Sequence, residues 1–167
     1  MNLRIASLLI VAAVLFPSPA FAQQELRPLP PLLRSVSDEV GALSAEQGEK
    51  LSVALYDILR KAGVRMVLVF AETTRPELLE DYAERLAQRW ARDRAIDPTR
   101  TIFVIVAIND REMRVMPGRA LGLSEALYQS GSTVDLDEHF RDGRFFDGLM
   151  LLTARIRKLI ESRPTTG

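Results

Sequence analysis

The clearest pattern in the chain is a continuous apolar run that turns directly into an alternating one. Residues 101–108 read Thr-Ile-Phe-Val-Ile-Val-Ala-Ile, and residues 112–115 then alternate polar and apolar. A run of β-branched and aromatic residues predicts a strand buried on both faces, whereas alternation predicts a strand with one face in water. Asn109-Asp110 between the two runs predicts a hairpin turn. The pattern therefore predicts a sheet that helices cover.

Two helices are predicted upstream by apolar residues at helical spacing. The first begins at Ser44, because residues 44–47 form a Ser-x-x-Gln capping box, and it ends at Gly63, which can adopt a left-handed conformation. A mostly apolar strand follows over residues 64–71. The second helix is expected to begin at Pro76, a residue favoured at the first helical position. Its inward-facing residues are Leu79, Tyr82, Ala83, Leu86 and Trp90.

Downstream of the hairpin, Gly118 and Gly122 bracket the start of a third helical segment. A final amphipathic helix places its apolar residues inward, namely Leu149, Leu152, Ile156, Leu159 and Ile160. The elements predict an α/β fold, a three-layer α/β/α sandwich with a small mixed β-sheet. Strands 64–71 and 101–108 are joined by a helical crossover, and the last pair is antiparallel. Loops at the carboxyl edge of such a sheet are the favoured place for a site.

The first 22 residues predict a cleavable signal peptide. Arg4 precedes an apolar run, a Pro-Ser-Pro break and the small-residue triplet Ala-Phe-Ala at 20–22. The run is too short for a membrane span, which needs about 20 apolar residues. We divide the chain into a signal peptide at 1–22, a Pro-rich linker at 23–34 and one domain at 35–163. We expect a periplasmic or secreted protein whose mature form has no membrane span.

Composition narrows the function classes further. The 22 basic and 22 acidic residues balance, so no global positive field favours nucleic acid as a partner. The chain has no cysteine, which removes thiol catalysis, disulfides and lipidation at the cleavage point. His139 is the single histidine, and no motif joins it to a serine such as Ser124 or Ser132. No catalytic residue can be named from the sequence.

Three motifs in series resemble the TPM domain family. They are the Val-Ser-Asp-Glu-Val-Gly-Ala-Leu-Ser segment at 36–44, the helix motif at 79–90, and the buried strand followed by Arg111, Gly118 and Leu121. Together they cover nearly all of the chain after the linker. The resemblance implies an α/β/α domain of exported or membrane-associated proteins. It also implies that some relatives bind divalent cations and that some have acid phosphatase activity.

The resemblance points to a candidate metal site. Asp38 lies on the opening motif, whereas family acids elsewhere are replaced, as in Thr-Arg-Thr at 99–101. Asp97 and Glu125 lie near enough in sequence to substitute for them. Ca²⁺ or Mg²⁺ would need several oxygen ligands, and Arg100 would oppose such a cation. The sequence identifies no cofactor by itself. If Ca²⁺ or Mg²⁺ binds, its candidate ligands are Asp38, Asp97 and Glu125.

A second candidate is an edge for a ligand or a protein partner, made by Arg100, Arg111, Gly118 and Arg119. Converging arginines would favour an anionic ligand, a carboxylate-bearing tail or a phosphate. The alternative is that these arginines lie on separate solvated surfaces. Two function classes follow. The first is a non-catalytic binding or accessory module for an envelope or membrane-complex partner, and the alternative is a divalent-cation-dependent acid phosphatase.

Overall fold

The computed structural model describes residues 25–93, 95–129 and 136–162, and the predicted signal peptide lies outside them. In this part of the chain, four strands form one mixed sheet in the order β1-β2-β3-β4. The strands are β1 (Val36–Asp38), β2 (Arg65–Ala71), β3 (Thr101–Ala107) and β4 (Glu112–Pro117). The first three are parallel, and β4 runs antiparallel to β3. This confirms the predicted small mixed sheet.

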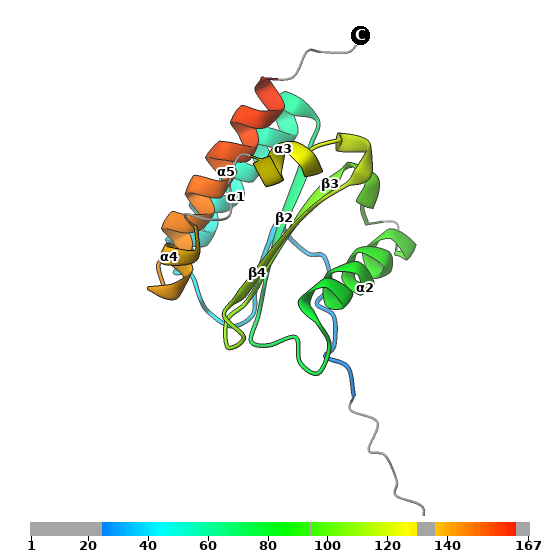
Figure 1. The fold of residues 1–167 in the computed structure, drawn as a ribbon, viewed down its shortest axis with the longest axis vertical. Helices are drawn as coiled ribbons and strands as arrows, with labels where there is room; N and C mark the ends of the chain where they lie inside the picture. The colour runs from blue at the N-terminus through cyan, green and yellow to red at the C-terminus, as the bar shows by residue number, and fades with distance from the viewer. Residues whose placement is uncertain (1–24, 94, 130–135, 163–167) are drawn as a thin grey trace, which may run out of the picture.

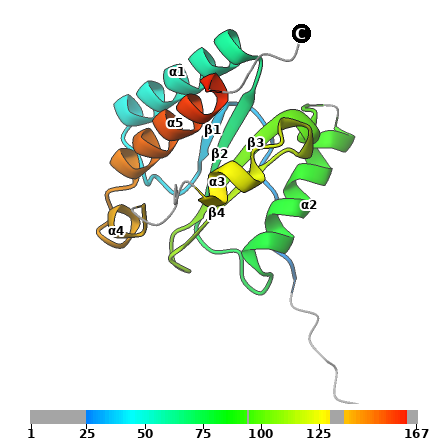
Figure 2. The same ribbon diagram turned by 45° about the horizontal axis from the view of Figure 1, so that its top comes forward.

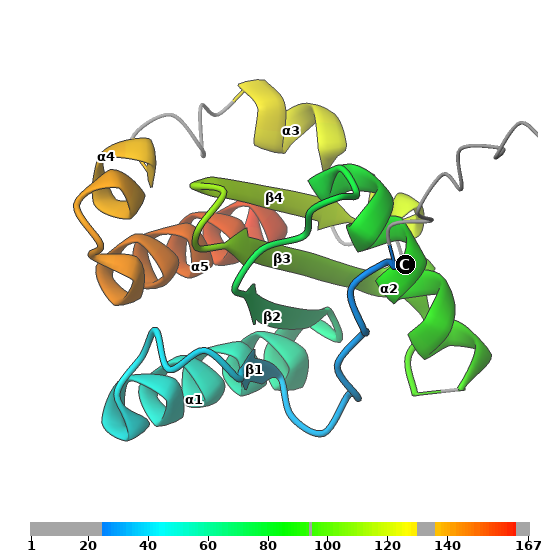
Figure 3. The ribbon, with the colours of Figure 1, turned by 90° about the horizontal axis from the view of Figure 1, so that it is seen from below.

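Helices cover both faces of the sheet, as Figure 3 shows. Helices α1 (Ala45–Ala62) and α5 (Phe145–Glu161) lie side by side on one face. Helix α2 (Leu79–Arg92) lies on the other face. The shorter helices are α3 (Ser124–Gln129) and α4 (Leu136–Arg141), with 3-10 turns η1 (Pro98–Arg100) and η2 (Arg119–Leu121). The three-layer α/β/α prediction is confirmed.

The position of β3 explains its continuous apolar sequence. All seven of its residues are buried. Ile102, Val104 and Val106 pack into the core with α1 and α5, whereas the intervening residues pack with α2. Among the latter, the ring of Phe103 stacks on Trp90 with centroids 6.1 Å apart. A strand with apolar cover on both faces needs apolar side chains at every position, so the alternation disappears.

The ends of α1 follow the local sequence. The hydroxyl of Ser44 accepts a hydrogen bond from the backbone of Gln47, whose side chain accepts one from the backbone of Ser44. Gly63 ends the helix in the left-handed region, with φ 65°. Both predictions are confirmed, because a capping box and a glycine C-cap act on backbone groups that the helix leaves without partners.

Two local expectations differ from the structure. Helix α2 begins at Leu79, so the prediction that Pro76 opens it is wrong. Pro76 lies in the preceding loop, after a cis peptide bond from Arg75, and this loop is held to the β3–β4 hairpin by Asp110. Strand β1 was not predicted, because a stretch of three residues carries no periodic signal.

The segment before β1 packs on the domain along α2 (Figure 3). Leu29 and Leu32 contact the core on this face of the sheet, and Arg85 Nη2 donates a hydrogen bond to the carbonyl oxygen of Arg27 at 2.9 Å. Residues 25–34 were expected as an extended linker, and they are extended but attached. None of the helices in the described ranges combines the length and the apolar content that crossing a membrane requires.

Candidate functional site

The two edges of the sheet separate the sequence-predicted residues. In β1, Asp38 pairs with Phe70 of β2, and the ends of β2 and β3 pair as Ala71 with Ala107. Asp38 and the β3–β4 hairpin therefore lie at the carboxyl edge of the parallel strands. At the amino edge, Ile102 pairs with Pro117, which places η1, η2 and the start of α3 there. Figure 1 and Figure 2 show α3 apart from the turn that joins β3 and β4.

Asp38 holds the connection from β1 to α1. Its two carboxylate oxygens accept hydrogen bonds from the backbone N–H groups of Ala42 at 3.1 Å and Leu43 at 2.8 Å. A hollow of about 720 Å³ lies beside it, with Glu49 and Tyr56 among the residues of its rim. Because both oxygens already accept backbone hydrogen bonds, the carboxylate has a structural role as an internal cap for the turn.

Asp97 caps η1 at the other edge. Its Oδ1 accepts hydrogen bonds from the hydroxyl of Thr99 at 2.7 Å and from the backbone N–H of the same residue at 2.9 Å. The hydroxyl contributes most to holding the pKa of Asp97 below its ordinary value, followed by the backbone N–H and then by the charges of Arg100 and Arg119. These groups favour the ionised carboxylate without a metal.

The three candidate metal ligands do not converge. Asp38 lies at the carboxyl edge, whereas Asp97 lies before β3 at the amino edge and Glu125 lies in the first turn of α3, which follows η2. The seven residues of β3 separate these edges, which is about 20 Å at the usual rise per strand residue. Across the described ranges, no three histidine, aspartate or glutamate side chains gather closely enough to hold a metal ion. The residues therefore do not fit a shared metal site, and whether the chain binds Ca²⁺ or Mg²⁺ is a question for a binding experiment.

The four residues predicted to form an edge for a ligand or a partner also lie at opposite edges of the sheet. Arg100, Gly118 and Arg119 lie together at the amino edge, where η1 and η2 pack against each other. Gly118 approaches the backbone of Thr99 so closely that a Cβ would stand 2.3 Å from its carbonyl oxygen. A mainly apolar hollow of about 510 Å³ adjoins this contact. Arg111 lies at the opposite edge, so these four residues do not form one surface.

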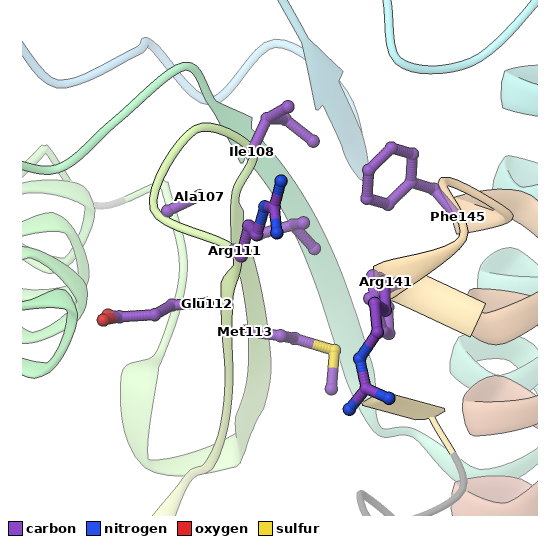
Figure 4. Close-up of a pocket in the computed structure, with 9 residues that line it drawn as sticks. Ala107, Ile108, Arg111, Glu112, Met113, Arg141 and Phe145 are labelled. Carbon is purple, nitrogen blue, oxygen red and sulfur yellow. The ribbon is translucent and has the colours of Figure 1, made fainter. Parts of the chain in front are cut away.

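A different hollow, of about 300 Å³, opens at the carboxyl edge around Arg111. Its walls come from the end of β3, the β3–β4 hairpin, α4 and the start of α5. Figure 4 shows Arg111 and Met113 on the side of the hairpin that faces Arg141 and Phe145, while the carboxylate of Glu112 points the other way. Arg141 was not among the sequence candidates, because nothing in the local pattern of a short helix connects it to a hairpin 30 residues away.

Asp110, predicted only as a turn residue, also joins two loops. Its side chain is 6% exposed and accepts hydrogen bonds from Thr73 Oγ1 at 2.8 Å, Thr74 N at 2.8 Å and Arg75 Nε at 3.2 Å. Burial acts to raise the pKa of Asp110, but the hydrogen bonds from Thr74 and Thr73 and the charge of Arg75 outweigh it and hold the pKa low. Asp110 thus locks the β2–α2 loop to the hairpin that carries Arg111.

Comparisons with known proteins agree with this architecture. The family model of the TPM domain matches residues 36–159. A comparison of the sequence with curated proteins finds no match. Among solved structures, the N-terminal domain of a protein from P. gingivalis is similar with a TM-score of 0.66 and 25% identity, over 77% of this chain and 82% of that one.

Two further structures share the fold at lower identity. The N-terminal domain of the cg2496 protein from Corynebacterium glutamicum has a TM-score of 0.60 and 14% identity, over 93% of this chain and 91% of that one. The BA42 protein from the psychrophilic bacterium Bizionia argentinensis has a TM-score of 0.59 and 15% identity, over 71% of this chain and 81% of that one.

Proposed function

Because the chain belongs to the TPM domain family, we propose that it is an exported, non-catalytic accessory module that binds an envelope or membrane-complex partner. The binding surface in this proposal is the carboxyl edge of the sheet, at the hollow between the β3–β4 hairpin and α4. Loops at this edge are the usual position of ligand sites in open α/β sheets. The signal peptide predicted at residues 1–22 supplies the expected route of export.

The proposal is carried by one observation, which is that the aspartates at this edge have hydrogen-bond partners whereas the arginines beside the hollow have no ion-pair partner in the described part of the chain. Asp38 and Asp110 each use their carboxylate oxygens to hold loops through short hydrogen bonds. Within the described residues, the guanidinium groups of Arg111 and Arg141 beside the hollow have no ion-pair partner, and the carboxylate of Glu112, which also lines the hollow, points away from Arg141. Such an arrangement suits recognition of a partner's negative group, whereas cation-assisted phosphoryl chemistry needs several oxygen ligands around one metal ion.

Phosphate ester hydrolysis is the alternative that an experiment must address, since the resemblance to the TPM domain family implies acid phosphatase activity for some relatives. The purified chain is incubated with p-nitrophenyl phosphate, with and without millimolar Ca²⁺ or Mg²⁺. We expect no release of p-nitrophenol above the protein-free rate. Cation-dependent turnover that is lost in Asp38→Asn and kept in the exposed control Glu49→Gln would show that the module is catalytic.

Partner binding is tested in the cell envelope with the full-length chain. A photo-reactive amino acid replaces Asn109, which is exposed in the β3–β4 turn at the carboxyl edge, or, as a control, Arg60 in the last turn of α1 near the amino edge. We expect irradiation to give one discrete adduct with an envelope protein from position 109 and none from position 60. Equal adducts from both positions, or none from either, contradict the proposal.

A further inference from the structure

The hollow at the carboxyl edge is bounded by two arginines that come from different elements. Arg111 follows the β3–β4 turn and Arg141 ends α4, and both line the same space of about 300 Å³. Within the described residues, neither guanidinium group makes an ion pair or a side-chain hydrogen bond. Two cations therefore face one hollow without a partner.

The acidic residues around this hollow either pair with other groups or point away from it. On either side of Arg141, Glu138 and Asp142 both pair with Arg144, at 3.9 Å and 3.0 Å. Asp110 is buried and bound to the β2–α2 loop. Glu112 lines the hollow, but its carboxylate points away from Arg141 (Figure 4). The local charge is positive, so an anion is the complementary ligand.

The backbone at Arg111 gives a second, independent indication. The turn is closed by a hydrogen bond from Arg111 N to the carbonyl oxygen of Ile108, and Arg111 adopts φ 56°. Hairpins of this kind usually place glycine at such a left-handed position, because other residues are strained there. A strained residue beside a hollow, where an unstrained one would serve the turn equally well, indicates that its side chain is needed for function.

Apart from Glu112, the rest of the lining is apolar. Val106, Met113, Phe140 and Phe145 contribute to it, and the two aromatic rings lie with their centroids 5.7 Å apart. The volume of about 300 Å³ is at the lower end of the range for small-molecule sites. A ligand that carries a small apolar group next to its anion therefore complements this space. A planar carboxylate matches the guanidinium fork, and it costs less to dehydrate beside phenylalanine rings than a phosphate dianion does.

We propose that this hollow binds a carboxylate attached to an apolar group, of the kind that ends a polypeptide whose last residue is apolar. This inference rests on the proposed function and deepens it, since it names the chemistry by which a partner is recognised. Arg111 and Arg141 hold the carboxylate from two sides, while Met113, Phe140 and Phe145 enclose the apolar side chain. The same chemistry occurs in a free organic acid and in a protein C-terminus.

The test measures binding of N-acetyl-L-phenylalanine to the purified chain by calorimetry and by amide chemical shifts. N-acetyl-L-phenylalaninamide, which lacks the charge, and inorganic phosphate, which lacks the apolar group, are the comparison ligands. We expect the carboxylate to bind and both comparison ligands to bind at least about tenfold more weakly. A five-residue peptide ending in phenylalanine, with a free or an amidated C-terminus, separates the two sources. Tighter binding of the free peptide than of the amino acid identifies a protein C-terminus, and equal binding identifies a small acid.

Variants locate the site. Arg111→Gln and Arg141→Gln are each expected to weaken binding of N-acetyl-L-phenylalanine by about tenfold or more. Arg114→Gln is the matched control, because it removes the same charge from the same strand at a position that pairs with Glu80 of α2. Each variant is first checked for the parent amide spectrum. Equal effects of all three substitutions, or equal binding of the amide and the acid, overturn the proposal.

The outcome can be separated from that of the proposed function. An envelope adduct from position 109 together with no carboxylate binding rejects the ligand chemistry and keeps the accessory role. Carboxylate binding together with cation-dependent turnover keeps the anion site and rejects the non-catalytic role.

Discussion

The indole Nε1 of Trp90 donates a hydrogen bond to the carbonyl oxygen of Pro30 at 2.9 Å. Trp90 is 1% exposed and stacks on Phe103 of the central strand, so the bond joins the N-terminal segment directly to the core. A buried indole N–H needs an acceptor, and the proline-rich segment supplies it without an N–H group of its own at that position. The domain therefore begins before the first strand of the sheet.

Leu32→Ala tests this attachment. Leu32 packs against the α2 side of the core, and its truncation is expected to lower the free energy of unfolding by about 1–2 kcal/mol, measured by urea denaturation. Leu33→Ala is the matched control, because Leu33 is 83% exposed and its truncation should change stability by less than about 0.5 kcal/mol. Equal effects of the two substitutions would mean that residues 25–34 are a free linker.

Asp110→Asn tests the lock between the β2–α2 loop and the hairpin. The side chain is 6% exposed and accepts hydrogen bonds from Thr73, Thr74 and Arg75. Removing its charge weakens these hydrogen bonds. We therefore expect the free energy of unfolding, measured by urea denaturation at neutral pH, to fall by about 1–3 kcal/mol. Asp57→Asn, at a half-exposed position of α1 that pairs only at 3.7 Å with Arg60, is the control and should have little effect.

The lowered pKa of Asp110 should also make the stability of the protein depend on pH. The folded-state pKa of Asp110 is lower than the unfolded value of about 3.9, so its stabilising contribution is complete above that pH. It is lost as the pH falls through the folded-state value. The unfolding free energy of the parent chain should therefore fall more steeply below about pH 4 than that of Asp110→Asn. Parallel curves for the two proteins would show that Asp110 is not responsible.

The fold could be predicted because buried positions produce a recognisable pattern of apolar residues in the local sequence. Thr101–Ala107 is apolar at every position since helices cover both faces, and the helix faces repeat at helical spacing. Strand β1 has no such sequence pattern, because its three residues form a strand only through parallel pairing with β2. Without β1, Asp38 had no position in the sheet, and its separation from Asp97 could not be foreseen.

Pairs across the carboxyl edge were missed for a related reason. Thr73 follows β2 and Asp110 follows β3, and they meet because these strands are parallel and in register at Ala71 and Ala107. The predicted crossover implied this proximity, so the pair could have been found from the sequence. Arg111 and Arg141 could not, since the packing of α4 beside the hairpin depends on tertiary contacts that no short-range pattern encodes.

Gly118→Ala tests the close contact between η1 and η2. The added Cβ would stand 2.3 Å from the carbonyl oxygen of Thr99, so the backbone must shift. We expect the free energy of unfolding, measured by calorimetry or denaturant, to fall by at least about 2 kcal/mol. Gly48→Ala in α1 is the control, because nothing lies within 4 Å of its added Cβ. Helix propensity predicts a gain of about 0.5–1 kcal/mol there. Two losses of equal size would contradict this account of Gly118.

Arg111→Gly separates stability from binding at the hairpin. Arg111 has φ 56°, a conformation that glycine adopts without strain, so the substitution should raise the free energy of unfolding by up to about 1 kcal/mol. Arg111→Ala removes the same guanidinium group but keeps a Cβ at that φ, and it should give no such gain. Both variants should lose binding of N-acetyl-L-phenylalanine, measured by calorimetry. A hairpin that becomes more stable while the anion site fails would explain why arginine, rather than glycine, occupies this turn; retained binding in the glycine variant would leave the strain at Arg111 without a function.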